Sequence, residues 1–196
     1  MRETDSTSQR GLLLVISGPS GAGKTTIARA LEKRISQSTF SVSMTTRPRT
    51  DNDREGIDYF FVNNARFEEV RLSGGFLEWA NVFGRNYGTP RAWVDDRLRE
   101  GKVVILEIDV AGGKQVRRHV PDMFGLFVLP PSEEALLDRL RARGRDDEEE
   151  IARRFSQAKR EMAEARACGV YDEFVVNDDL DAAIEQSLLL VRARLM

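Results

Sequence analysis

The sequence has almost none of the two residue types that build disulfide frameworks and structural zinc sites. Its 196 residues include one cysteine, Cys168, and one histidine, His119. A lone cysteine has no intrachain partner, and structural zinc sites take four ligands, drawn mainly from these two residue types. The composition therefore excludes an intrachain disulfide, argues against structural zinc and favours a reducing compartment. We expect Cys168 to be a packing residue near a helix end and His119 to face solvent at the end of another helix.

Long apolar runs and a one-sided charge are also missing. No segment approaches the roughly 20 apolar residues that cross a bilayer. The opening MRETDSTSQR lacks the apolar core of a signal peptide, and we interpret residues 1–10 as a disordered polar tail. The 30 basic residues nearly balance the 32 acidic ones, so no global charge points to nucleic acid or an anionic membrane. We expect a cytoplasmic protein that binds small molecules, and the sequence leaves open whether it is a monomer or a homodimer.

What the sequence does contain is a regular alternation of short apolar runs and longer amphipathic segments. This alternation is typical of an α/β protein with a parallel sheet and helices on its faces, and the length fits a single domain over residues 11–196. The expected strands are LLLVIS (12–17), FSVS (40–43), VVILEI (103–108), MFGLFVL (123–129) and EFVVN (173–177). The expected helices lie near residues 24–35, 91–100, 113–119, 133–142, 148–167 and 179–194.

Two segments interrupt the alternation. The first combines a charged, turn-rich stretch, RPRTDNDREG, with DYFFV, a short helix and EWANVFGRNYG, and we interpret about residues 43–89 as an insertion on the main sheet. The second, RLRARGRDDEEEIARR, is almost entirely charged and predicts either a solvated helix pair or a mobile flap over about residues 139–155. The expected core is formed by residues 11–42, 90–138 and 156–196.

Two of the expected helices carry recognisable start signals. Thr89 offers a capping hydroxyl, and Pro90 follows it at the first helical position. Ser132 precedes Glu133 and Glu134, whose charges favour the positive end of a helix. We therefore expect helices to begin directly after Thr89 and Ser132.

The strongest local motif is GPSGAGKT, residues 18–25. It matches the phosphate-loop pattern of glycine, four free positions, glycine, lysine and a hydroxyl residue, and it lies between an expected strand and an expected helix. Glycines let backbone N–H groups close around phosphate oxygens, and the helix N-terminus adds its positive end. We expect Lys24 to neutralise the outer phosphates and the Thr25 hydroxyl to hold Mg²⁺. The expected ATP-binding residues of this segment are Gly18, Pro19, Ser20, Gly21, Ala22, Gly23, Lys24, Thr25 and Thr26.

Phosphate loops serve switches, motors, transporters and small-molecule kinases, so other segments must identify the reaction. Six of them are FSVSMTTRPR (40–49), GIDYFFV (56–62), FLEWANVFGRNYGT (76–89), LEIDVAGG (106–113), LPPSEEALLDRLRARGR (129–145) and FVVNDDLDAA (174–183). In order and spacing they resemble guanylate kinase, the enzyme family that passes the γ-phosphoryl group of ATP to GMP. The resemblance covers nearly everything from residue 12 onward. It implies a P-loop NTPase-type parallel sheet flanked by helices, an inserted GMP-binding subdomain, a mobile lid, and Mg²⁺ with ATP as the phosphoryl donor.

One acid stands where burial is expected. Glu78 lies between Leu77 and Trp79, and a buried carboxylate is costly unless something pairs with it. The residues alone leave two readings: the acid points to water on an alternating strand, or a ligand supplies its partner. The resemblance implies the second, because guanine presents N1–H and an exocyclic N2 amine as adjacent donors to one carboxylate. Adenine has an acceptor at N1 and would leave the charge unsatisfied.

The resemblance also assigns the other contacts to GMP. It places the hydroxyls of Ser43 and Thr89 at the guanine O6, and Asp109 as a second acceptor for the N2 amine. The simpler alternatives are a strand end for Ser43, a helix cap for Thr89 and a turn residue for Asp109. For the GMP phosphate, the resemblance implies a clamp of one arginine fork and two phenol hydroxyls. The residues at those positions are Arg47, Tyr59 and Tyr87.

The sequence departs from the family pattern next to this clamp. The family commonly has a second arginine three residues after the first, followed by a proline-glycine-glutamate turn, whereas Thr50 and TDNDRE occupy this stretch here. Arg49 is the expected substitute for the second arginine, and Arg54 is the other candidate. Two further departures are Glu107, where aspartate is usual, and Ala111, where glutamine is usual.

Phosphoryl transfer between two anions depends on alignment and on cations, because the attacking phosphate oxygen already carries charge. The resemblance implies that Arg139, Arg143 and Arg154 in the charged flap fold over the triphosphate, with Arg139 and Arg143 also binding ATP. The expected catalytic residues are Lys24, Arg47, Arg143 and Arg154. We expect the insertion and the flap to move inward together when both substrates bind.

Two alternatives differ from this reading. Guanylate-kinase-like domains of scaffold proteins bind phosphorylated peptides without catalysis, but they characteristically lack a working phosphate loop. A related P-loop kinase could act on another phosphorylated sugar or nucleotide, and the altered RPRTDNDREG segment keeps that alternative open.

Overall fold

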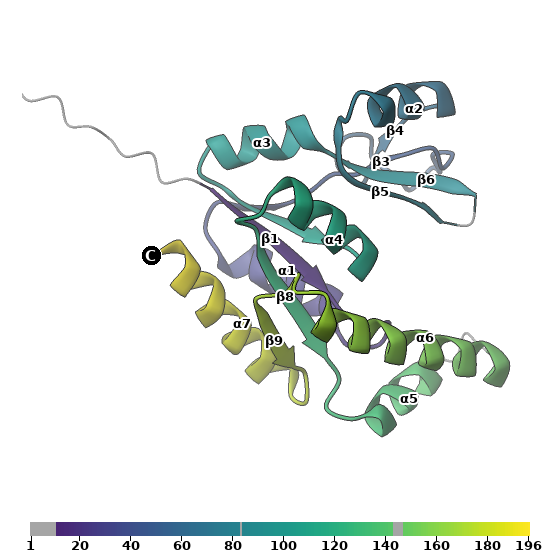
Figure 1. The fold of residues 1–196 in the computed structure, drawn as a ribbon, viewed down its shortest axis with the longest axis vertical. Helices are drawn as coiled ribbons and strands as arrows, with labels where there is room; N and C mark the ends of the chain where they lie inside the picture. The colour runs from purple at the N-terminus through teal and green to yellow at the C-terminus, as the bar shows by residue number, and fades with distance from the viewer. Residues whose placement is uncertain (1–10, 83, 143–146) are drawn as a thin grey trace, which may run out of the picture.

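The computed structural model describes residues 11–82, 84–142 and 147–196. Its larger sheet has five strands, and every neighbouring pair is parallel, as the α/β prediction requires (Figure 1). In order across the sheet these strands are β2 (Ser38–Phe40), β7 (Val103–Glu107), β1 (Leu12–Ser17), β8 (Phe124–Leu129) and β9 (Glu173–Val176). The central strand, β1, is buried along its whole length, which explains its uninterrupted apolar run.

The helices cover both faces of this sheet. Apolar side chains of α1 and α7 pack on one face, and those of α3, α4, α5 and α6 form the cluster on the other. Successive residues of β1 serve the two faces in turn, because Leu13 and Val15 belong to one cluster and Leu14 and Ile16 to the other. The helix bounds are α1 (Lys24–Arg34), α3 (Arg91–Arg99), α4 (Val110–His119), α5 (Glu133–Ala142), α6 (Glu148–Ala167) and α7 (Leu180–Leu195).

A second, smaller sheet is built from the segment that interrupts the alternation. Its strand order is β4-β3-β6-β5, with β5 at an edge, and α2 packs on it through Phe67 and Phe76, whose ring centroids lie 4.6 Å apart. The register between β5 and β6 shifts between Phe76 and Glu78, so three successive β5 residues are buried. The elements are β3 (Met44–Thr45), β4 (Phe60–Phe61), α2 (Asn64–Leu72), β5 (Phe76–Val82) and β6 (Arg85–Pro90).

Two boundaries differ from the sequence predictions. The strand predicted at residues 40–43 lies at β2 instead, because pairing with β7 ends at Phe40 and the chain then leaves for the second sheet. Helix α4 begins at Val110 and not near Gly113, because the Asp109 carboxylate accepts a hydrogen bond from Gly112 N at 2.7 Å and caps the helix there.

The two predicted helix caps have opposite outcomes. Thr89 does not cap α3: the cap position is Pro90, and the Thr89 hydroxyl donates instead to the Glu78 carboxylate. The Ser132 cap is confirmed, since its hydroxyl oxygen accepts a hydrogen bond from Ala135 N at 3.0 Å. Cys168 follows α6 and packs half-buried against the core, as predicted. Within the described ranges, no helix combines the length and the apolar character that crossing a bilayer requires.

Candidate active site

The phosphate loop joins the carboxyl end of β1 to the first turn of α1. Gly21 and Gly23 have φ angles of 93° and 89°, in the left-handed region that favours glycine. Gly23 holds the cap position of α1, and no side chain accepts a hydrogen bond there. Backbone N–H groups at the start of α1 are thereby left to bind an anion, and Lys24 is the first residue of the helix.

Asn177 holds this loop from the other side of the sheet. It is buried just after β9, and its Nδ2 donates to the Ala22 carbonyl oxygen at 2.8 Å. A Cβ atom on Gly23 would lie only 2.2 Å from Asn177 Nδ2, so this contact also requires glycine. Sequence reasoning did not identify Asn177. Its position directly after a buried strand, at the edge where the carboxyl ends of parallel strands meet, is the signal that could have done so.

Two oxygen ligands meet beside the loop. The Thr25 hydroxyl donates to the Glu107 carboxylate over 2.5 Å, which joins the start of α1 to the end of β7. In the described ranges no three His, Cys, Asp or Glu side chains gather as a metal site. Mg²⁺ in phosphoryl-transfer sites needs only one or two protein oxygens beside substrate phosphates and water, and it prefers oxygen ligands. Thr25 and Glu107 therefore fit magnesium.

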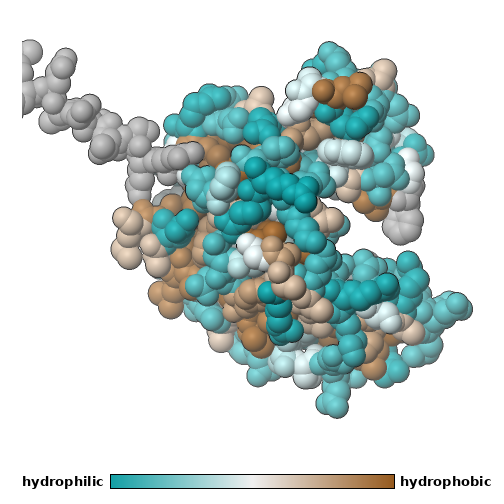
Figure 2. Space-filling view, in the orientation of Figure 1, coloured by the Kyte–Doolittle hydropathy of each residue, from teal (hydrophilic) through white to brown (hydrophobic). Residues whose placement is uncertain are grey.

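A pocket opens between the two sheets. It is lined in part by Ser43 before β3, Tyr59 before β4, Thr89 of β6 and Glu107 of β7. The two hydroxyl residues that the resemblance assigns to guanine O6 thus face one pocket. In the space-filling view, a hollow lies on the same side of the molecule as this pocket, between the second sheet and the α5–α6 pair. Most residues at its rim are hydrophilic (Figure 2).

Glu78 lies behind this pocket with only 8% of its surface exposed. Its Oε1 accepts a hydrogen bond from the Thr89 hydroxyl at 2.6 Å, and it forms no ion pair with any described residue. Burial raises the pKa of the Glu78 carboxyl, and the charge of Asp109 raises it further against the opposing effect of the Thr89 hydrogen bond. A Cβ atom on Gly112 would come within 3.3 Å of Oε2, so glycine leaves that oxygen room.

The backbone around Glu78 is fixed by α4. Because β5 is an edge strand, part of its backbone lacks a strand partner, and α4 side chains supply one. Gln115 accepts from Trp79 N at 3.2 Å and donates to Trp79 O at 3.1 Å, while His119 Nδ1 lies 2.8 Å from Leu77 O. His119 is exposed as predicted, yet it has this backbone contact, and sequence reasoning missed both α4 residues because their partners lie 36 and 42 positions away.

The residues expected to clamp the GMP phosphate lie together on the second sheet. The Arg47 guanidinium carbon is 5.4 Å from the Tyr59 ring centroid, and the Tyr59 and Tyr87 rings are 5.9 Å apart. Among the described residues, the Arg49 side chain contacts a backbone oxygen, that of Asp53, at 3.0 Å. Arg54 instead pairs with the Asp58 carboxylate at 3.0 Å.

The flap arginines differ in their surroundings. Arg154 lines a pocket between α6 and the loop residue Ser20, and its Nε donates to Glu150 at 3.1 Å. Hydrogen bonds from Arg153 and then Arg154 lower the pKa of Glu150 to about 2. Arg139 Nη2 donates to the Asn177 carbonyl oxygen at 2.9 Å, beside the residue that holds the phosphate loop. Arg143, also predicted here, lies outside the described residues.

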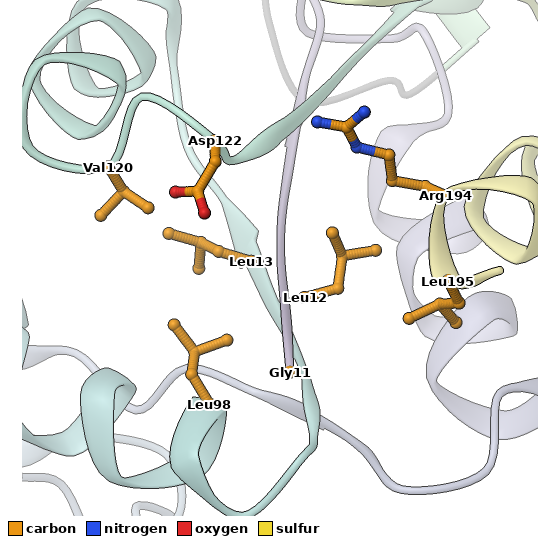
Figure 3. A pocket seen from close by; sticks show the side chains of 8 residues that line it. All are labelled: Gly11, Leu12, Leu13, Leu98, Val120, Asp122, Arg194 and Leu195. Carbon is orange, nitrogen blue, oxygen red and sulfur yellow. The ribbon is translucent and has the colours of Figure 1, made fainter. Parts of the chain in front are cut away.

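Another pocket lies at the opposite end of β1 (Figure 3). Its walls are mostly leucine and valine side chains, with Asp122 and Arg194 as the charged members. It contains none of the predicted site residues. In sheets of this kind ligands bind outside the carboxyl ends of the strands, so this pocket is on the wrong side for a nucleotide.

Comparison with known proteins agrees with this geometry. The family model described as guanylate kinase matches residues 10–192. The chain is 48% identical to a guanylate kinase of Anaeromyxobacter dehalogenans over 183 residues, covering 93% of this chain and 80% of that protein. It is 43% identical to one from Coxiella burnetii over 181 residues, covering 92% and 86% respectively. The crystal structure of guanylate kinase from Anaplasma phagocytophilum superimposes with a TM-score of 0.71 at 30% identity, covering 96% of this chain and 88% of that one.

The first prediction concerns Gly23. Gly23→Ala should weaken ATP binding at least roughly tenfold and lower the free energy of unfolding by about 1–3 kcal/mol, because Cβ strains the backbone and displaces Asn177. The matched control is Gly74→Ala, where φ is 71° but nothing lies within 4 Å of the added Cβ. Calorimetric titration with ATP and chemical denaturation measure both effects. Unchanged ATP affinity in Gly23→Ala would contradict the role given to this glycine.

The second prediction concerns the stability cost of Glu78. Its raised pKa means that the folded state binds the proton more tightly than the unfolded state does, so stability falls as pH rises from the ordinary glutamate pKa through the raised one. Glu78→Gln keeps an acceptor for Thr89 and removes the charge. It should therefore be more stable than the parent at pH 8, by a margin that shrinks toward pH 4.5. Denaturation at both pH values, with exposed Glu173→Gln as control, tests this; a margin that grows toward low pH would be contrary to it.

Proposed function

This chain belongs to the guanylate kinase family, and from that premise we propose which of its residues transfer the γ-phosphoryl group of ATP to GMP or dGMP, giving ADP and GDP or dGDP. The observation that carries the proposal is the buried Glu78 carboxylate, whose described partners are the neutral hydroxyl and backbone N–H of Thr89. A buried carboxylate in that position would be stabilised by a ligand with two adjacent hydrogen-bond donors. Guanine is such a ligand.

Guanine recognition follows from the pocket between the sheets. Glu78 accepts the N1–H and N2 donors, and the hydroxyls of Ser43 and Thr89 face O6. Asp109 caps α4 through one carboxylate oxygen, which leaves the other as an acceptor near the N2 amine. Adenine offers an acceptor where Glu78 needs a donor, so it is rejected by the cost of an unpaired buried charge.

The GMP phosphate lies against Arg47, Tyr59 and Tyr87 in this proposal. The Tyr59 ring lies beside the arginine and the Tyr87 ring beside Tyr59, and their hydroxyls would add neutral donors to the charged fork. Arg49 is the second phosphate arginine, because among the described residues its guanidinium pairs with a backbone oxygen and with no carboxylate. Arg54 is less suited, because its fork is already occupied by Asp58.

The ATP phosphates lie in the loop between β1 and α1. Lys24 neutralises the outer phosphates, and Thr25 and Glu107 are the residues that would hold Mg²⁺. When bound, Mg²⁺ neutralises charge that spreads over the transferred phosphoryl oxygens. The GMP phosphate needs no strong base to attack, so the protein's contribution is to align two anions and to screen their repulsion.

We divide the chain by the same roles. Residues 11–42, 90–138 and 156–196 form the core, about 43–89 bind GMP, and about 139–155 form the lid. Arg154, with Arg143, supplies lid charge to the triphosphate, and Arg139 supports ATP near Asn177. Arg154 must exchange Glu150 for phosphate oxygens as the lid closes. We place the reaction in the cytoplasm, where a protein with one cysteine needs no disulfide.

The third prediction tests base recognition directly. With ATP and magnesium, the parent should turn over GMP and dGMP and leave AMP, CMP and UMP nearly untouched. Glu78→Gln should lower kcat/KM for GMP at least roughly hundredfold, because one amide oxygen cannot accept both guanine donors and the amide N–H₂ opposes one of them. Coupled ADP release measures this, with Glu173→Gln as the matched control. Equal turnover of GMP by Glu78→Gln and its control would remove Glu78 from base recognition.

The fourth prediction decides between the two arginines. Arg49→Ala should raise KM for GMP roughly ten- to hundredfold, the loss of one charge-assisted hydrogen bond, without changing KM for ATP. Arg54→Ala should change KM for GMP little, since Asp58 already occupies its fork. Steady-state kinetics with each substrate varied separates the two, and the reverse order of effects would assign the role to Arg54.

A further inference from the structure

Arg47 is held from one side by an acid of its own loop. Its Nη1 donates to Asp53 Oδ2 at 3.0 Å, and its Nη2 donates to Asp53 Oδ1 at 2.8 Å. The carboxylate therefore binds the outer end of the guanidinium through two parallel hydrogen bonds. Nη1 also lies 3.2 Å from the Pro48 carbonyl oxygen, its second acceptor. This pair is no loose surface contact, because the side chains of Arg47 and Asp53 are only 28% and 15% exposed.

The donors that Asp53 leaves unused form a second fork. A guanidinium has five N–H groups: two on Nη1, two on Nη2 and one on Nε. Both Nη1 groups and one Nη2 group are engaged, and within the described part of the chain Nε of Arg47 makes no hydrogen bond. Nε–H and the remaining Nη2–H lie along the side edge of the plane, spaced to bind two oxygens of one phosphate.

Asp53 is itself fixed by the segment that departs from the family pattern. The N–H and the hydroxyl of Thr50 both donate to Asp53 Oδ2 at 2.7 Å, and Arg49 Nε donates to the Asp53 carbonyl oxygen. Thr50 stands where the family commonly has an arginine. Hydrogen bonds from Arg47 and Thr50 hold the pKa of the Asp53 carboxyl far below its ordinary value, so Asp53 is charged at neutral pH.

Two aromatic rings also lie beside the Arg47 guanidinium. Its central carbon lies 5.4 Å from the Tyr59 ring centroid and 5.3 Å from that of Phe61. The carboxylate at the end of the guanidinium leaves the side edge, Nε–H with one Nη2–H, as the pair of donors without a described partner.

We propose that Asp53, supported by Thr50, is a positioning residue that holds Arg47 with its side edge ready for the GMP phosphate. The inference deepens the proposed function, since it requires that Arg47 binds that phosphate. A long arginine side chain that is fixed beforehand loses less conformational freedom when the substrate arrives. The opposite role, an acid that competes with the phosphate for Arg47, fits less well, because Asp53 occupies one edge of the guanidinium and leaves the other open.

Steady-state kinetics of the full chain tests the proposal. Asp53→Ala should raise KM for GMP at least tenfold and leave KM for ATP unchanged. The KM for GMP of Asp53→Asn should lie between those of the parent and Asp53→Ala, because the amide oxygen keeps one acceptor. Thr50→Val should raise KM for GMP by a smaller factor. Asp51→Asn, an exposed acid of the same turn, is the matched control and should match the parent. An unchanged or lowered KM for GMP in both Asp53 variants overturns the proposal, and the lowered value identifies Asp53 as a competitor.

Two further measurements separate this inference from its premise. Calorimetric binding of guanosine, which has no phosphate, should be equal in the parent and in Asp53→Ala; a loss shows that the substitution disturbs the base pocket and overturns a role confined to the phosphate. Arg47→Ala should raise KM for GMP more than Asp53→Ala does. If Arg47→Ala leaves that KM unchanged, the proposed phosphate clamp fails and the inference falls with it. If only the Asp53 variants leave it unchanged, the clamp stands and the inference alone fails.

Discussion

A carboxylate buried without a charged partner is the constraint around which the second sheet is organised. The shift in register between β5 and β6 turns Glu78 inward, and Thr89 across the hairpin supplies its neutral hydrogen bond. Gln115 and His119 of α4 fix the backbone on both sides, so the acid is held by core and insertion together. The raised pKa of Glu78 shows that burial disfavours its charged form in the absence of ligand. In the proposed function the guanine donors complete this arrangement, which would link a local electrostatic penalty to substrate choice.

The cations of the site show the complementary pattern. Arg47 pairs with Asp53, and Arg154 pairs with Glu150, each acid lying a few residues away in sequence. Arginines gathered for two anionic substrates would repel one another without substrate, and neighbouring carboxylates offset that repulsion. The two pairs still differ. Asp53 leaves the side edge of Arg47 without a described partner, whereas Arg154 uses its own Nε on Glu150.

Features set by local sequence were predictable, and features set by distant contacts were not. The phosphate loop and the Ser132 cap depend on neighbouring residues, and they lie where expected; the parallel sheet is indicated by the alternation of strand and helix patterns along the chain. Thr89 is predicted to be a helix cap, yet its hydroxyl donates to the carboxylate of Glu78, 11 positions away. The helix predicted to begin near Gly113 includes both Gly112 and Gly113 inside α4, where Glu78 and Tyr171 lie close to the position of an added Cβ. Asn177, Gln115 and Asp53 have no motif of their own, and only the fold reveals their partners.

The most direct test of this account is the pKa of Glu78 itself, followed by NMR titration of its side-chain carboxyl carbon, first in the free protein and then with GMP bound. Desolvation without a partner predicts a value above the ordinary glutamate range in the free protein. Two guanine donors favour the charged form, so the account predicts that GMP lowers the pKa of Glu78 and that AMP leaves it unchanged. A pKa that is ordinary in the free protein, or that does not move with GMP, would contradict the claim that guanine is the partner of this buried charge.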